Sequence, residues 1–184
     1  MEPGATKSPT LMLDRLEKAI RTVMDFPTPG IAFRDITPIL AEAELLRIAV
    51  EGLVAPFRDS GVTKVVGIEA RGFIFGAMLA DELDAGFIPV RKKGKLPYRT
   101  ISESYALEYG LDTIEMHVDA VSETDRVLIH DDVIATGGTA AATRRLVENG
   151  GGSVVGYAFL VELAALGGRK LLENNLPIHA LLRF

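Results

Sequence analysis

Two adjacent carboxylates followed by a glycine-rich turn form the most informative segment of the sequence. Asp131 and Asp132 follow an apolar run, and the turn Thr-Gly-Gly-Thr (136–139) leads into an alanine-rich stretch. Such a turn at a helix start presents unpaired backbone N–H groups, hydroxyls and the positive end of the helix dipole, which together favour a phosphate group. Carboxylates accept hydrogen bonds from sugar hydroxyls or hold the water ligands of Mg²⁺. The segment therefore predicts a site for a phosphorylated sugar such as a ribose 5-phosphate.

Each half of this segment is common in proteins without any ligand there, because Gly-Gly often marks a turn and Asp-Asp a solvated loop. The two halves joined between a strand-like and a helix-like run are far less common. The sequence contains neither G-x-x-x-x-G-K-[ST] nor G-x-G-x-x-G, the two other frequent phosphate-binding patterns.

Positive charge is concentrated in residues 91–99, which hold five of the 20 Lys and Arg residues and no acidic residue. Such a run is usually a solvated surface, but Gly94 and Pro97 after a predicted strand also suit a mobile lid. A shorter segment, Glu69-Ala-Arg71, ends at a predicted helix start and offers a guanidinium group to an anion. Arg71 could equally pair with Glu69 at the surface.

Composition excludes several classes of protein. The absence of cysteine excludes disulfides, thiolate catalysis and Cys-based metal sites, and the three histidines lie far apart. A formal net charge of −5 disfavours a nucleic-acid partner. No apolar run approaches the roughly 20 residues that cross a bilayer, and the N-terminus lacks the apolar stretch of a signal peptide. We expect a cytoplasmic protein without a membrane partner, with a disordered leader over residues 1–10 and a single domain over 11–184.

Apolar periodicity predicts alternating helices and strands. Leu13, Leu16, Ile20 and Val23 are spaced as one face of a first helix that ends before Pro27. Further helices are predicted over 41–58, 72–84, 139–149 and 164–174, strands over 64–68, 87–90, 113–118, 126–130, 154–161 and 178–182, and an irregular segment over 91–110. This order favours an α/β fold, a mostly parallel twisted sheet with helices on both faces. Ligands of such sheets bind beyond the carboxyl ends of the strands.

The segment 131–139 resembles the loop that binds 5-phosphoribosyl 1-diphosphate in type I phosphoribosyltransferases. Five more segments, 25–38, 69–76, 90–97, 105–110 and 160–163, are similar to motifs of the adenine phosphoribosyltransferase family and occur in the family's order. The resemblance covers about residues 13–183. It implies the type I phosphoribosyltransferase fold with a small N-terminal hood, formed mainly by residues 11–40 and the C-terminal part, and an isologous homodimer.

The resemblance also implies roles for individual residues. Residues implied to bind the 5-phosphate and ribose are Asp131, Asp132, Ala135, Thr136, Gly137, Gly138 and Thr139. Those implied to bind diphosphate are Glu69, Ala70, Arg71, Arg91, Lys92 and Lys95. Those implied to bind adenine are Ala32, Phe33, Arg34 and Leu163. Glu108, Arg71 and Lys92 are implied to be catalytic, with Glu108 as acid/base, and Mg²⁺ is expected to be carried by the substrate without direct protein ligands, reaching Asp131 and Asp132 through water.

The implied reaction transfers the phosphoribosyl group from phosphoribosyl diphosphate to adenine, which gives AMP and diphosphate in purine salvage. Two alternatives stay open at this point. One is the same chemistry on another purine such as hypoxanthine or xanthine; the other is a non-enzymatic regulator that senses phosphoribosyl diphosphate. His130 is a departure from the family pattern and is expected either in the core or beside Asp131, where it would tune that carboxylate.

Overall fold

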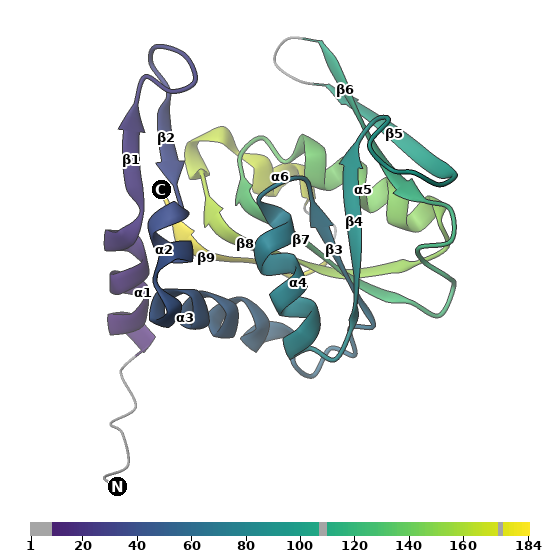
Figure 1. Cartoon of the computed structure of the whole chain (residues 1–184), viewed down its shortest axis with the longest axis horizontal. Coiled ribbons are helices and arrows are strands. Elements are labelled where there is room, and N and C mark those ends of the chain that lie inside the picture. Colours follow the sequence, from purple (N-terminus) through teal and green to yellow (C-terminus); the bar gives the residue numbers. More distant parts are fainter. Residues whose placement is uncertain (1–8, 107–109, 173–174) are drawn as a thin grey trace, which may run out of the picture. The chain divides into compact units, whose positions relative to one another are not determined.

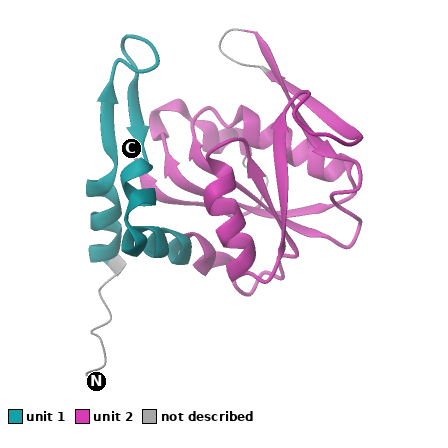
Figure 2. Ribbon diagram, in the orientation of Figure 1, with its two compact units in different colours: residues 1–52 teal, residues 53–184 magenta. Residues whose placement is uncertain are grey.

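Seven strands form one sheet in the larger of two compact units. The computed structural model describes residues 9–106, 110–172 and 175–184, and the chain divides into unit 1, Met1–Gly52, and unit 2, Leu53–Phe184 (Figure 2). Each unit has its own sheet, of two strands in unit 1 and seven in unit 2. No helix of these described ranges is both long and apolar enough to cross a bilayer.

Unit 1 consists of short helices and a hairpin. Its elements are α1 (Pro9–Ala19), β1 (Arg21–Met24), β2 (Ala32–Asp35), α2 (Thr37–Ala41) and most of α3 (Ala43–Val54). Helix α1 begins two residues inside the stretch expected to be a leader. The predicted helix through Val23 is wrong beyond Ala19, because Val23 pairs with Phe33 in the antiparallel β1–β2 hairpin. Four apolar residues at helical spacing do not reveal such a cross-strand pairing.

Unit 2 contains the main sheet, with strand order β5-β6-β4-β3-β7-β8-β9 (Figure 1). The strands are β3 (Lys64–Ile68), β4 (Gly86–Lys92), β5 (Thr100–Ala106), β6 (Leu111–His117), β7 (Arg126–Ile134), β8 (Ser153–Glu162) and β9 (Ile178–Arg183). The helices are η1 (Ala55–Phe57), α4 (Gly72–Glu82), α5 (Gly138–Asn149), η2 (Ala164–Leu166) and α6 (Gly168–Leu172). Strands β4, β3, β7, β8 and β9 are parallel, whereas β6 and β5 add antiparallel at one edge.

Helices cover both faces of this sheet. Val66 of β3 and Ile129 of β7 belong to the apolar core that includes Leu146 of α5. The next residue of β7, His130, lies edge-on to Phe75 of α4, with ring centroids 6.2 Å apart. Since successive side chains of a strand point to opposite faces, α4 and α5 cover opposite faces, as Figure 1 shows. The predicted α/β class, with a mostly parallel sheet between helices, is confirmed.

Three local predictions for unit 2 are wrong. Residues 91–110 were expected to be irregular, but β4 runs to Lys92 and β5 follows; β5 is rich in polar residues, so apolar periodicity does not reveal it. The strand expected to end at His130 continues to Ile134, because it stays paired with β8 up to Glu162. The helix expected over 164–174 is divided into η2 and α6 at Gly167, whose φ of +67° a continuous helix does not allow.

His130 is a core residue of the sheet. Its side chain has no exposed surface, and Nδ1 lies 2.9 Å from the carbonyl oxygen of Ala158. A carbonyl only accepts, so Nδ1 carries the proton. Burial, opposed by this hydrogen bond, lowers the pKa of His130 to about 4, and the ring is neutral at pH 7. Of the two alternatives for His130, the core position is the one observed.

The buried ring predicts a specific loss of stability in acid. The unfolded chain binds a proton at the ordinary His pKa of 6.5, whereas folded His130 resists it until about pH 4. Stability from this residue is therefore complete above pH 6.5 and falls by about 3 kcal/mol on going to pH 4. We expect His130→Gln to lose less unfolding free energy than the wild type between pH 7 and 4, measured by urea denaturation. Equal losses in the two proteins would contradict a buried neutral ring.

Candidate functional site

The turn between β7 and α5 surrounds a small cavity at the carboxyl edge of the sheet. Residues 133–140, together with Asp131 and Phe159, line a volume of about 80 Å³. The first hydrogen bond within α5 runs from the N–H of Ala141 to the carbonyl of Gly137 at 2.9 Å. The N–H groups that precede Ala141 in this first turn have no helical partner by geometry. A cavity next to such donors suits an anion.

Glycine is required at position 137. Its φ is +80°, and a Cβ built there would lie 2.5 Å from the carbonyl oxygen of Gly168. An L side chain would suffer both backbone strain and this collision. The turn therefore keeps its shape because it packs, backbone against backbone, on the start of α6. The sequence pattern predicted the glycine but not the partner against which it packs.

The two predicted carboxylates lie at the end of β7 and differ in their environment. Asp132 is 3 % exposed, and its Oδ2 receives a hydrogen bond from Nε of Arg71 at 2.5 Å. Oδ1 of Asp131 accepts the backbone N–H of Asp132 at 2.9 Å. Burial and then the charge of Asp132 raise the pKa of Asp131 well above its ordinary value. Arg71 thus joins the predicted diphosphate segment directly to the predicted ribose carboxylates.

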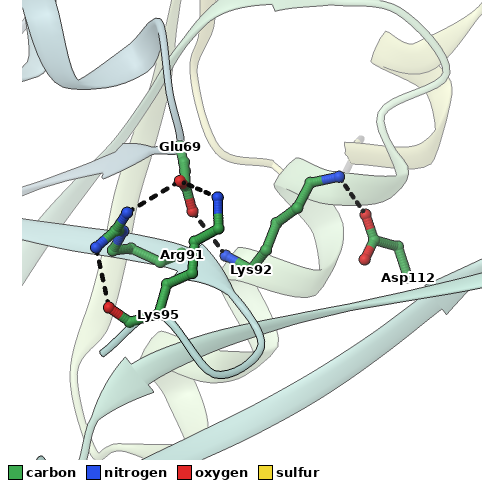
Figure 3. A network of polar contacts seen from close by, with 5 residues as sticks. All are labelled: Glu69, Arg91, Lys92, Lys95 and Asp112. Carbon is green, nitrogen blue, oxygen red and sulfur yellow. Dashed lines mark hydrogen bonds and ion pairs between the residues drawn. The ribbon is translucent and has the colours of Figure 1, made fainter. Parts of the chain in front are cut away.

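Glu69 lies at the centre of a group of cationic residues (Figure 3). Its Oε1 is 2.8 Å from Nζ of Lys95 and 3.1 Å from Nη2 of Arg91, and its Oε2 accepts the backbone N–H of Lys92 at 3.0 Å. Burial opposes ionisation, but the bonds from Lys95, Arg91 and Lys92 outweigh it and lower the pKa of Glu69 to about 2. The Glu69–Ala70 peptide bond is cis. Of the predicted diphosphate residues, the structure brings the side chains of Arg91 and Lys95 and the backbone N–H of Lys92 to this carboxylate.

The side chain of Lys92 is directed to a different acid. Its Nζ lies 3.1 Å from Oδ2 of Asp112, and the same oxygen accepts the hydroxyl of Tyr105 at 3.3 Å. The hydrogen bond from Lys92, stronger than the opposing effect of burial, lowers the pKa of Asp112. Figure 3 shows Lys92 extending away from Glu69 towards this carboxylate. Each of the three predicted diphosphate cations in this view is therefore held by an acidic group.

Two acidic residues of this region were missed in the sequence. Asp112 contacts Lys92, and Glu115, 7 % exposed, accepts the N–H of Gly94 at 2.9 Å and fixes the turn that carries Lys95. Both lie on β6, whose position beside β4 depends on an antiparallel pairing that periodicity does not reveal. The alternation of residues 113–118 predicted a strand, which is confirmed, but it did not indicate the strand's partner.

The predicted adenine residues are divided between the two units. Ala32, Phe33 and Arg34 lie on β2 of unit 1, where the Phe33 ring is edge-on to Phe26 at 5.1 Å between centroids. Leu163 follows β8 in unit 2, and its N–H donates to the carbonyl of Ile134 at 2.9 Å. Glu108 lies outside the residues that the structure describes. Within the described part of the chain, no group of three or more His, Asp or Glu side chains could hold a metal ion.

Comparison with known proteins identifies the class. The phosphoribosyl transferase domain family matches residues 40–174, and the chain belongs to this family. It is 56 % identical over 164 residues to an adenine phosphoribosyltransferase of Acidothermus cellulolyticus, which covers 89 % of this chain and 92 % of that protein. The crystal structure of adenine phosphoribosyltransferase from Rhodothermus marinus is similar with a TM-score of 0.92 and 65 % identity, covering 95 % of this chain and 99 % of that one. The yeast enzyme (Saccharomyces cerevisiae), complexed with an imino-altritol bisphosphate and adenine, has a TM-score of 0.87 and 38 % identity, covering 94 % and 99 %.

The coupling between the two carboxylates can be measured directly. Asp132→Asn removes a negative charge beside Asp131, so the pKa of Asp131 should fall. It should remain above the ordinary value, because burial is the larger cause of its elevation. Carboxyl ¹³C chemical shifts followed against pH report this pKa, and Asp119→Asn, a change at an exposed acid, serves as the control. An unchanged or higher Asp131 pKa in Asp132→Asn would contradict the coupling.

Proposed function

We propose that this protein transfers the 5-phosphoribosyl group from phosphoribosyl diphosphate to adenine, forming AMP and diphosphate in purine salvage. The observation that carries this proposal is the bond from Arg71 to Asp132, 2.5 Å long. It joins a segment rich in bound cations to a pair of carboxylates beside a phosphate-sized cavity. A substrate with a 5-phosphate, a ribose diol and a diphosphate matches the cavity, the two carboxylates and the cationic segment, in that order. The names of the relatives support adenine as the acceptor.

We assign the sugar phosphate to the end of β7 and the start of α5. Residues 135–139 line the cavity. Their backbone N–H groups and the hydroxyls of Thr136 and Thr139 can donate hydrogen bonds to a phosphate monoester. Asp131 and Asp132 accept hydrogen bonds from the ribose hydroxyls. The elevated pKa of Asp131 indicates that a donor or a cation next to it would relieve an unfavourable burial of charge.

The diphosphate leaving group binds where Glu69 now holds the cations. Nζ of Lys95 and the guanidinium of Arg91 contact Glu69 in this structure, so diphosphate must compete with that carboxylate for them. Arg71 and the backbone of residues 69–70 complete the site. As the bond from the anomeric carbon to diphosphate breaks, its electron pair leaves with the diphosphate oxygen, and Arg71 and Lys92 stabilise the negative charge that develops there. Residues 91–99, the segment interpreted as a lid, exclude water from this step, because water would otherwise capture the cation-like sugar.

The base contacts are assigned to individual residues, as the resemblance implies. Phe33 stacks on adenine, the backbone of Ala32 and Arg34 reads its polar edge, and Leu163 covers the base. A fixed set of backbone donors and acceptors rejects hypoxanthine or guanine, because the wrong base leaves buried polar groups unpaired. Glu108 is assigned as the acid/base residue that exchanges a proton with the five-membered ring of adenine.

Mg²⁺ is proposed as the cofactor and arrives with the substrate. The donor chemistry fits this mode: Asp131 and Asp132 are adjacent carboxylates, but Asp132 is already paired with Arg71, which disfavours a cage made by the protein alone. When bound, Mg²⁺ neutralises part of the diphosphate charge. The two carboxylates would hold its water ligands. We also retain a homodimer and a cytoplasmic location as proposals.

Turnover with purine bases tests the proposal. The purified protein with phosphoribosyl diphosphate, Mg²⁺ and adenine should release AMP and diphosphate, followed by chromatography, and hypoxanthine and xanthine should react far more slowly. Turnover of hypoxanthine but not adenine would contradict the base assignment. Binding of phosphoribosyl diphosphate with no turnover of any base would favour the regulator instead.

Two neighbouring lysines provide a matched test of the diphosphate site. Lys95 contacts Glu69, whereas Lys93 is exposed and outside this cluster. Lys95→Met should lower kcat/KM for phosphoribosyl diphosphate by about 10- to 100-fold, because one charged donor to the leaving group is lost. Lys93→Met removes the same charge from the same segment and should change kcat/KM by less than about twofold. Equal effects of the two substitutions would indicate a general charge effect and not a contact.

A further inference from the structure

An ion pair lies at the carboxyl end of β8, between the buried Glu162 and the partly exposed Arg169. Glu162 is 5 % exposed, and both of its carboxylate oxygens accept hydrogen bonds from Arg169. The shortest of these bonds runs from Nη2 of Arg169 to Oε2 and measures 2.6 Å. Nη1 of Arg169 also donates to the carbonyl of Ile178 at 2.8 Å. One guanidinium therefore ties the last residue of β8 to the first residue of β9.

The segment between Glu162 and Ile178 packs against the turn at residues 135–138. Gly168, the residue before Arg169, donates its N–H to the carbonyl of Ala135 at 3.1 Å. A Cβ built on Gly168 would collide with that same carbonyl oxygen and lie 2.7 Å from the backbone nitrogen of Gly137. The two backbones thus fit together with no space for a side chain on either glycine. A displacement of Gly168 must displace residues 135–137 as well.

We propose that Arg169, held by Glu162, is a positioning residue for the 5-phosphate: it fixes Gly168 and through it the shape of the turn at 135–138. The inference rests on the proposed function, which places the 5-phosphate at that turn. Arg169 touches no substrate in this account. Its role is to keep the N–H groups of the turn in place before the phosphate arrives, so that binding does not require ordering of the loop.

Three features argue for this role. The planar guanidinium makes a forked contact that a lysine does not reproduce. Neither Glu162 nor Arg169 belongs to the apolar core of unit 2, and Arg169 bonds the backbone carbonyl of Ile178 and not its side chain. The hydrogen bonds from Arg169 outweigh burial and lower the pKa of Glu162, so the carboxylate is ionised and the pair is intact at neutral pH.

Substrate-specific kinetics test the proposal. The variants are Arg169→Met, Arg169→Lys and Gly168→Ala, with Arg144→Met as the control, since Arg144 makes an equally short 2.6 Å bond to Glu148 on the exposed face of α5. Arg169→Met and Gly168→Ala should raise KM for phosphoribosyl diphosphate and Kd for AMP by about ten- to hundredfold. KM for adenine at saturating phosphoribosyl diphosphate should stay within about twofold of the wild type. Arg169→Lys should raise KM for phosphoribosyl diphosphate and Kd for AMP by less than Arg169→Met does. Arg144→Met should change neither constant.

The outcomes distinguish a failure of the positioning role from a failure of the proposed function. Equal weakening of adenine and of the phosphorylated ligands, or no change in Kd for AMP, would overturn the positioning role. If Arg169→Met does not fold, Arg169→Lys and Glu162→Gln decide by the same comparison, with thermal unfolding as a check on their integrity. A wild type that forms no AMP from adenine would overturn the proposed function itself, whereas a fully active wild type with unaffected variants would overturn only this inference.

Discussion

The close contact between the backbones of Gly137 and Gly168 is the constraint on which the candidate site depends. It allows the chain to leave β7, turn with a positive φ at Gly137 and start α5 with its N–H groups beside a cavity. A side chain at either glycine would separate the two backbones. The site is thus defined by main-chain geometry. The sheet contributes by carrying β7 and β8 in parallel to the same edge, where Ile134 and Glu162 are paired.

Charge is arranged in pairs throughout this edge. Arg71 is bound to Asp132, Lys95 and Arg91 to Glu69, and Lys92 to Asp112. The net charge of −5 conceals this arrangement, because acidic residues hold the cations in place and do not simply oppose them. In the proposed function, a diphosphate that enters this site exchanges one anionic partner of the cations for another. This exchange costs less than collecting free lysines and arginines from solvent, since their side chains are already partly ordered.

The class of the fold was predicted from the sequence for physical reasons, and the anion chemistry of the turn at 136–139 stays a prediction. Residues 64–68 and 154–161 are short, apolar and contain several β-branched residues, so their burial as strands follows directly. The order of Asp131-Asp132 and Thr-Gly-Gly-Thr predicts an anion site at the end of the strand. What could not be predicted depends on pairing across long sequence separations. Val23 joined a hairpin, β5 formed from polar residues, and β7 continued through the carboxylates because β8 paired with it. Three charged residues that pair with site residues or with one another, Asp112, Glu162 and Arg169, were missed for the same reason. No local pattern distinguishes them from ordinary surface charges.

A crystal structure with ribose 5-phosphate shows whether the turn at 136–139 binds the sugar phosphate. We expect the phosphate oxygens to accept hydrogen bonds from backbone N–H groups of residues 136–139, while the ribose hydroxyls contact Asp131 and Asp132. Gly168 should keep its contact with Ala135 in that complex. A phosphate bound instead among Arg91, Lys92 and Lys95, with the turn at 136–139 empty, would contradict the account.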